Sequence, residues 1–262
     1  MRAWPRPLVV SLDVLNRRGK SVGVRLARYT GKSPHFIHPK HLIETPGHDW
    51  YVAHLRPGDR VLDVGCANGA HTLKAASRVK QVLGMDYDVA QLQVAAATAR
   101  SRRTPNVRLI AWDLTRPFPF PDGTFDSALF LDVIEHLATR QPVLREIRRV
   151  LKPGGRLLVS GPNRESQWRE RLRRAGLYSF QDPDHKVEYT RGEFVAELRE
   201  GGFVLEGPLE PVVYDTPWAG LIDAIGGLSL GIYARLARWK RERALADPRE
   251  STGFRAVARR PA

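Results

Sequence analysis

From residue 60 onward, short apolar runs alternate with longer stretches that read as helices. The apolar runs predict buried strands, and the stretches between them carry few breakers. The predicted strands are Val61–Val64, Gln81–Asp86, Asn106–Trp112, Phe125–Leu131, Arg156–Ser160, Phe203–Leu205 and Phe254–Ala258. The predicted helices are Thr72–Val79, Val89–Arg102, Pro142–Leu151 and Arg191–Glu200. This alternation is typical of an α/β fold, a doubly wound, mostly parallel sheet with helices on both faces.

The first fifty residues show no strand pattern. Pro34, Pro39 and Pro46 predict turns and at most short helices. We therefore expect residues 1–50 to form an N-terminal helical extension or cap, and residues 51–262 to form the main domain. Four histidines in the extension could bind a metal, face a substrate or lie on the surface. They are His35, His38, His41 and His48.

Two segments of the main domain depart from the alternation. Residues 162–189 combine charges and aromatics with few apolar runs, which predicts an insertion that caps the site. Residues 217–245 carry apolar residues near helical spacing and predict a C-terminal helix. It is no transmembrane span, because Asp223 and four glycines interrupt it. It could contact a membrane surface, pack over a substrate pocket or form a dimer.

Acidic residues recur where the predicted strands end. Ligands of open parallel sheets bind at the carboxyl ends of the strands, so these acids mark the candidate site. A turn from Gly65 to Gly69 follows the first strand, and its glycines let a ligand approach the main chain. Its spacing differs from the G-x-G-x-x-G pattern of nicotinamide-binding proteins. The acids are Asp63, Asp86, Asp113 and Asp132.

The charge is strongly positive and unevenly distributed. Lys and Arg number 42 against 28 Asp and Glu, a net charge of +14. The excess is concentrated in residues 1–60, 164–174 and 235–262. It suggests an anionic partner, either nucleic acid, a phosphorylated substrate or an acidic membrane, unless the charges are merely solvated.

The remaining composition is that of a globular chain, with 42% hydrophobic and 27% charged residues. Cys66 is the only cysteine, which excludes an internal disulfide framework and a cysteine-cluster zinc site. No signal peptide is visible at the N-terminus. These features fit a cytoplasmic protein, with peripheral membrane contact as an alternative.

Five motifs in a fixed order are more specific than the glycine turn alone. Together they resemble the class I S-adenosylmethionine-dependent methyltransferases over roughly residues 50–210. The resemblance implies a Rossmann-like fold with a seven-stranded sheet, and S-adenosyl-L-methionine as cofactor. The motifs are Val61–Gly69, Gly84–Asp86, Ala111–Leu114, Phe125–Leu137 and Arg149–Leu157.

The resemblance also implies roles for individual residues. Asp63 and the backbone of Gly65, Cys66, Ala67 and Gly69 would hold the methionine end of the cofactor. Asp86 would accept hydrogen bonds from both ribose hydroxyls. Asp113 and the Leu114 amide would read the adenine edge, with Tyr87 on the ring face, and Asp132 would line the methionyl group. Ala67 stands where the family often has a third glycine. Asp88, by contrast, is interpreted as a helix N-cap.

The methyl acceptor is the least determined part of this interpretation. An oxygen acceptor needs a base, and the candidates are His136 and His185. Asp132, Glu135 and His136 also have the spacing of a divalent-metal cluster in some methyltransferases, although we expect no metal. The segment after residue 160 looks like that of methyltransferases for small molecules, including sugars and lipid-linked acceptors. The alternatives are an RNA methyltransferase and an inactive, cofactor-binding partner subunit.

Overall fold

The computed structural model describes residues 4–32, 38–43 and 49–262, and it divides into two compact units. One unit is formed by residues 1–48, 163–183 and 211–253. The other is formed by residues 49–162, 184–210 and 254–262. The glycine turn and the four strand-end acids belong to the second unit, here called the sheet unit. The first is called the helical unit.

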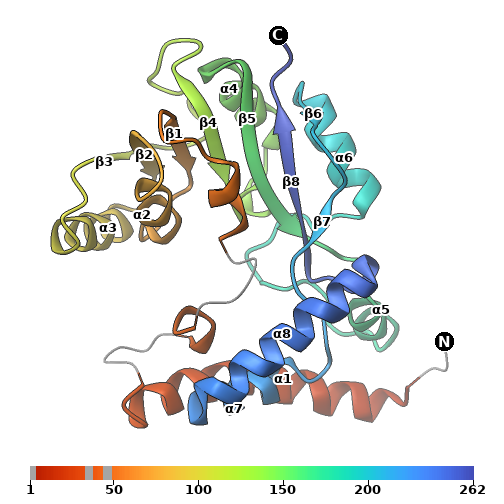
Figure 1. Cartoon of the computed structure of the whole chain (residues 1–262). Coiled ribbons are helices and arrows are strands. Elements are labelled where there is room, and N and C mark those ends of the chain that lie inside the picture. Colours follow the sequence, from red (N-terminus) through yellow and green to blue (C-terminus); the bar gives the residue numbers. More distant parts are fainter. Residues whose placement is uncertain (1–3, 33–37, 44–48) are drawn as a thin grey trace. The chain divides into compact units, whose positions relative to one another are not determined.

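The sheet confirms the predicted α/β architecture (Figure 1). Among the described residues it has eight strands, and its main path runs β3-β2-β1-β4-β5-β8-β6, with β7 paired to β8. The pairs β1–β2, β2–β3, β1–β4 and β4–β5 are parallel, whereas β6 and β8 are antiparallel. The path has the seven predicted strands, and the eighth has two residues. The strands are β1 (Arg60–Val64), β2 (Gln81–Asp86), β3 (Val107–Ala111), β4 (Phe125–Phe130), β5 (Leu151–Pro162), β6 (Val204–Leu205), β7 (Glu210–Pro211) and β8 (Gly253–Arg259).

Hydrophobic clusters cover both faces of this sheet. Leu62 and Val64 of β1 lie in the larger cluster, and Val61 lies in the second. Successive residues of a strand point to opposite faces, so an uninterrupted apolar run is what two covered faces require. The helices of the sheet unit are α2 (Ala70–Ala76), α3 (Val89–Ser101), α4 (Arg140–Val150) and α6 (Arg191–Glu200), with 3-10 turns η2 (Trp50–His54) and η3 (Ile134–His136).

Side-chain caps set the starts of two of these helices. Asp88 accepts hydrogen bonds from the amides of Ala90 and Gln91, which confirms its interpretation as the N-cap of α3. Thr190 and Glu193 form a reciprocal capping box at the start of α6. These caps explain why both helices begin at the positions predicted from the sequence.

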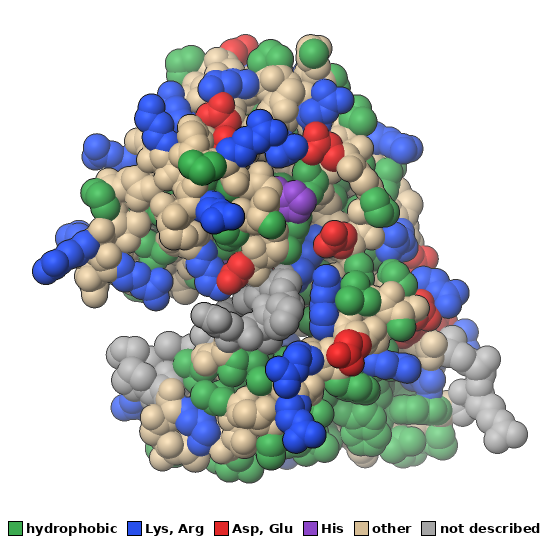
Figure 2. Space-filling view, in the orientation of Figure 1, with side chains coloured by type: hydrophobic (Ala, Val, Ile, Leu, Met, Phe, Trp, Pro, Cys, Tyr) green, Lys and Arg blue, Asp and Glu red, His purple; other side chains and the backbone are tan. Residues whose placement is uncertain are grey.

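The helical unit differs more from the sequence expectation. Helix α1 (Arg6–Tyr29) spans 24 residues of the segment expected to form a helical extension, although its bounds were not predicted. The predicted helix over 217–245 is two helices, α7 (Ala219–Leu228) and α8 (Leu230–Ala246), separated at Ser229, which caps α8. Helix α5 (Gln167–Arg174) and the 3-10 turns η1 (Pro39–His41) and η4 (Pro248–Glu250) complete the unit. Hydrophobic side chains gather on the surface over α1 and α7 (Figure 2).

Candidate active site

The strand-end acids come together at one edge of the sheet. Asp63 lies in β1 and Asp86 is the last residue of β2, whereas Asp113 and Asp132 each follow their strand by two residues. Strands β1 to β4 are parallel neighbours, so their carboxyl ends share this edge. The chain order reverses between β1 and β4, and such a switch point is where open α/β sheets bind ligands.

The glycine turn is tied to β2 by its own amides. The amides of Gly65 and Cys66 donate to the Met85 carbonyl over 2.8 and 3.0 Å. The amide of Ala67 donates to Oδ2 of Asp86 over 2.8 Å. These N–H groups have acceptors within the protein, so the turn is a preformed surface whose glycines expose the main chain.

Two positions of the turn require glycine. Gly65 has φ +76°, and a Cβ there would lie 2.6 Å from a methyl group of Val133. Gly69 has φ +75°, and a Cβ there would lie 2.8 Å from the Cβ of Ala95. Ala67 also has a positive φ, +43°, which costs a non-glycine residue roughly 1–2 kcal/mol.

Asp63 is a buried carboxylate next to a second acid. Its Oδ2 accepts a hydrogen bond from the Thr72 hydroxyl over 2.6 Å. Burial, reinforced by the neighbouring charge of Asp86, raises the pKa of Asp63 to about 6, although the Thr72 hydrogen bond acts in the opposite direction. A cationic ligand group beside Asp63 would relieve this desolvation. That environment suits a ligand that carries an ammonium group.

Asp86 is buried, and backbone amides donate hydrogen bonds to its carboxylate. Besides the Ala67 amide, it accepts the amide of Asp88 on Oδ1 over 2.9 Å. A carboxylate oxygen has more than one acceptor position, so each oxygen retains capacity for a further donor. Two hydroxyl donors on neighbouring carbons match this pair of oxygens.

The outer acids are more accessible. Asp113 is exposed, and hydrogen bonds from the Thr115 amide and hydroxyl lower its pKa, which keeps it ionised. Leu114 is buried, and Tyr87 is 79% exposed, so the Tyr87 ring can stack on a planar ligand. Asp132 has a left-handed φ of +56° and is held by Ser160, whose hydroxyl donates to its Oδ1 over 2.6 Å. Strained residues of this kind cluster at functional sites.

The two candidate bases lie together. The rings of His136 and His185 are 4.9 Å apart in an edge-to-face arrangement. Nδ1 of His185 lies 2.9 Å from Oε1 of Glu188, and Nε2 lies 3.9 Å from Oε1 of Glu135. Glu188 was not identified from the sequence, because residues 185–188 form no helix in which spacing would predict the contact.

This cluster also has the composition of a metal site. Ligand atoms of Glu135, His136 and His185 all lie within 4.8 Å of one another. Asp132, which has the matching spacing in the sequence, is not part of that group. Of the N-terminal histidines, His35 and His48 and the His41 side chain lie outside the described residues. His38 lies in the helical unit, where its Nε2 is 3.3 Å from Asp223.

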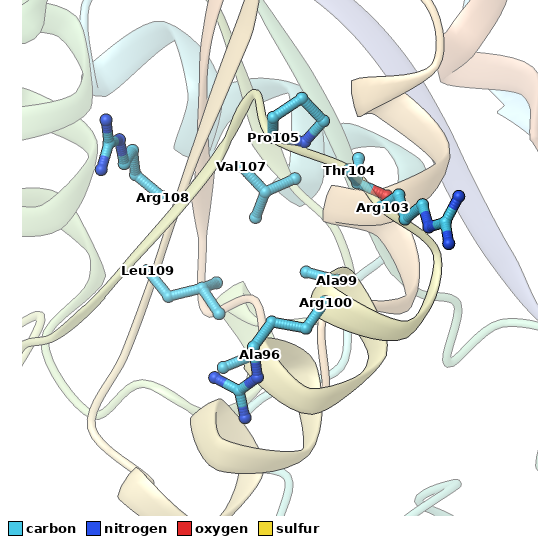
Figure 3. A pocket seen from close by; sticks show the side chains of 9 residues that line it. All are labelled: Ala96, Ala99, Arg100, Arg103, Thr104, Pro105, Val107, Arg108 and Leu109. Atoms are coloured by element: carbon cyan, nitrogen blue, oxygen red, sulfur yellow. The ribbon is translucent and has the colours of Figure 1, made fainter.

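A separate cavity of about 600 Å³ lies between the end of α3 and the start of β3 (Figure 3). Arg100, Arg103 and Arg108 are among its lining residues. The cavity is displaced toward the amino end of β3, whereas the acids lie at the carboxyl ends. Its lining contains none of the candidate site residues, so it is not the site described above.

Known proteins with similar sequences match mainly the sheet unit. A family model described as a methyltransferase domain matches residues 62–159. A probable S-adenosylmethionine-dependent methyltransferase of Mycolicibacterium smegmatis is 32% identical over 64% of this chain and 70% of its own length. The 27-O-demethylrifamycin SV methyltransferase of Amycolatopsis mediterranei is 30% identical over 66% of this chain and 65% of its length. A demethylmenaquinone methyltransferase of Symbiobacterium thermophilum is 39% identical over 42% of this chain and 46% of its length.

Solved structures support the fold. The crystal structure of the [4+2]-cyclase SpnF aligns with a TM-score of 0.60 and 24% identity, over 82% of this chain and 80% of that one. A SAM-dependent methyltransferase from Aquifex aeolicus aligns with a TM-score of 0.55 and 17% identity, over 81% and 89%. At this identity the structures establish the architecture, whereas the sequence relatives establish the family. The chain therefore belongs to the S-adenosylmethionine-dependent methyltransferases of class I, and S-adenosyl-L-methionine is its cofactor.

Proposed function

We propose that this enzyme transfers a methyl group to an oxygen atom of a small-molecule acceptor, either a sugar or a lipid-linked compound, with or without a phosphate. The observation that carries the proposal is the pairing of His136 with His185 and Glu188 at the carboxyl edge of the sheet. An oxygen acceptor must lose a proton, and this pair supplies a base. Two of the relatives are named for small-molecule acceptors, demethylrifamycin and demethylmenaquinone.

The strand-end acids form the cofactor site in this proposal. The buried Asp63 and the backbone from Gly65 through Cys66 and Ala67 to Gly69 would hold the methionine end. Asp86 would accept the two ribose hydroxyls with its remaining acceptor positions. Tyr87, Asp113 and the Leu114 amide would hold the adenine, and Asp132 would contact the methionyl group.

Catalysis then combines alignment with proton removal. The cofactor supplies a methyl group on a sulfonium, and its transfer is an in-line displacement that depends on positioning and exclusion of water. His136 is exposed and accepts the proton from the acceptor hydroxyl. His185 is held by Glu188, which leaves its Nε2 directed toward Glu135 and its ring against His136. His185 is a second candidate for the base and otherwise positions His136.

Substitution of the two histidines tests this proposal. The enzyme is incubated with S-adenosyl-L-methionine and sugar and lipid extracts, and products are identified by a mass increase of one methyl group. We expect His136→Ala to lower kcat by at least about 100-fold with cofactor affinity unchanged. His54→Ala is the control, because the His54 carbonyl contacts Arg156, which pairs with Ser127 in the first half of β4.

Three other results would redirect the assignment. Full activity of both histidine variants would remove the base from the mechanism. Cofactor binding without turnover of any acceptor would favour a partner subunit. Activity that a chelator abolishes and a divalent cation restores would assign the cluster of Glu135, His136 and His185 to a metal. We also propose a cytoplasmic location, supported by the free thiol of Cys66.

A further inference from the structure

Helices α1 and α7 of the helical unit pack backbone against backbone. A Cβ added to Gly19 would lie 2.2 Å from the carbonyl oxygen of Gly220, and one added to Gly23 would lie 2.3 Å from that of Asp223. Gly227 approaches the Gly23 carbonyl closely as well, since a Cβ added there would lie 2.5 Å from it. Glycine contacts of this kind bring helices together without large side chains between them. Most of the closest contacts of this helix pair therefore involve glycine backbone, and the Cβ of Leu26 also lies beside Gly227.

Several of these side chains point outward from α7. Trp218, Leu221 and Leu228 are 46%, 44% and 58% exposed, and Ile232 at the start of α8 is 52% exposed. Asp223 is the one charged residue between 217 and 234. It is buried and faces inward, to the Tyr233 hydroxyl and His38. The outer face of α7 is therefore apolar without interruption.

Helix α1 adds a second apolar stripe. Leu8, Leu15, Val22 and Tyr29 are exposed and follow one another at intervals of seven residues. Seven residues are close to two helical turns, so these side chains share one side of α1. Contiguous exposed apolar patches that are rimmed by polar residues mark interaction sites.

The same unit carries most of the net positive charge. It holds 20 Lys and Arg against 10 Asp and Glu, whereas the sheet unit holds 22 against 18. Helix α1 contains six basic residues, and its one acid, Asp13, is paired with Arg17 over 2.9 Å. Helix α8 contains five basic residues and one acid. Exposed arginines, among them Arg18 and Arg25, lie on the same helix as the apolar stripe.

We propose that α1, α7 and the start of α8 form a surface that binds an anionic phospholipid bilayer. Apolar side chains would enter the boundary between headgroups and acyl chains while the basic side chains contact the headgroups. Trp218 and Tyr29 are residue types that favour this interface. No helix of the described residues is long and apolar enough to cross a membrane, so the helices would lie along the surface.

Charge and composition favour a bilayer over other occupants. A second copy of this unit would place one strongly positive surface against another. Nucleic acid would satisfy the charge and leave the apolar face of α7 in water. An anionic bilayer satisfies both features. This inference concerns where the enzyme binds and goes beyond the proposed reaction.

Vesicle sedimentation of the 262-residue chain tests the proposal. Vesicles of phosphatidylglycerol and phosphatidylcholine in equal amounts are compared with pure phosphatidylcholine. We expect sedimentation with the anionic vesicles, weakened by salt. The double substitution Leu221→Ser/Leu228→Ser should weaken binding at least about tenfold. Arg18→Gln and Arg25→Gln should each weaken it about fivefold.

Matched substitutions in the sheet unit control for general effects. Val94 and Val204 are 53% and 51% exposed there, so Val94→Ser/Val204→Ser changes two comparable side chains. This control should bind vesicles as the wild type does. Circular dichroism and cofactor binding establish that each variant is folded.

Other outcomes would overturn the proposal. These are equal sedimentation with neutral vesicles, no sedimentation, or unchanged binding by the double α7 variant. RNA binding tighter than vesicle binding would assign the charge to nucleic acid. A dimer in solution that dissociates on the α7 substitutions would assign the apolar face to a second copy.

Discussion

Replacing Asp63 by asparagine should change the pH dependence of stability in a direction opposite to that of most carboxylates. Asp63 is buried beside Asp86, and its pKa in the folded protein is about 6, against an ordinary value of 3.8. The folded state thus binds the proton more tightly than the unfolded state. The contribution of Asp63 to stability is full below pH 3.8 and is lost as the pH rises through 6.

The magnitude follows from the shift of about two pKa units. At 1.36 kcal/mol per unit, ionised Asp63 costs about 3 kcal/mol in the absence of a cofactor. An asparagine at this position has no charge to desolvate, but its hydrogen bond with Thr72 differs from that of the acid. We therefore expect the Asp63→Asn variant to be more stable than wild type by about 1–3 kcal/mol at pH 7.5, and the advantage to vanish near pH 4.

Urea unfolding of both proteins without cofactor, at several pH values between about 4 and 7.5, measures this difference. Subtracting the two free energies of unfolding cancels other groups that titrate equally in both proteins. Asp88→Asn reports the general effect of removing one carboxylate charge. A wild-type-minus-variant difference that stays constant across the range would refute the reasoning. The variant should also lose most of its cofactor affinity at the upper end of this range.

Two further substitutions test the turn and the histidine pair. Gly65→Ala should lower the free energy of unfolding by roughly 2–5 kcal/mol, because the new Cβ meets Val133 and φ is positive. Gly154→Ala has a similar φ of +74° and open space, so it should cost only about 1–2 kcal/mol, and equal losses in urea unfolding would contradict the packing argument. Glu188→Gln should lower kcat without changing KM for the cofactor, because His185 loses its charged partner. A change confined to KM in steady-state kinetics would show that Glu188 acts elsewhere.

The strands and helices of the sheet unit were predictable because their local signals agree with their surroundings. Strand β2 and helix α6 begin and end at the predicted residues. The strand is an apolar run buried on both faces, and the helix has a capping box at its start and Gly201 after its end. The residues next to each boundary therefore predict where the element begins and ends.

The bounds of helix α1 were not predicted, because glycines form part of its packing face. Gly19 and Gly23 lie on its buried side and contact the α7 backbone. Glycine reads as a helix breaker in isolation, and only the partner helix, roughly two hundred residues later, makes it favourable. The break at Ser229 was not predicted, because apolar residues continue on both sides of it at helical spacing.

In the candidate site, too, local sequence patterns predict some features and not others. The strand pattern predicts where Asp63 and Asp86 lie. It does not predict how deeply they are buried or which hydrogen bonds they make. The left-handed conformations of Ala67 and Asp132 depend on tertiary contacts. The contact of His185 with Glu135 joins segments fifty residues apart, which no local pattern reports.

The central claim, that the strand-end acids hold S-adenosyl-L-methionine, is tested most directly by calorimetric titration of the cofactor into Asp86→Ala and Asp88→Ala. The two acids are two residues apart, and Asp88 caps α3. Loss of two hydrogen bonds to a charged acceptor should weaken binding by Asp86→Ala at least about 100-fold. Asp88→Ala should bind as the wild type does and lose only about 1 kcal/mol of stability. Wild-type affinity in a folded Asp86→Ala variant would contradict the account.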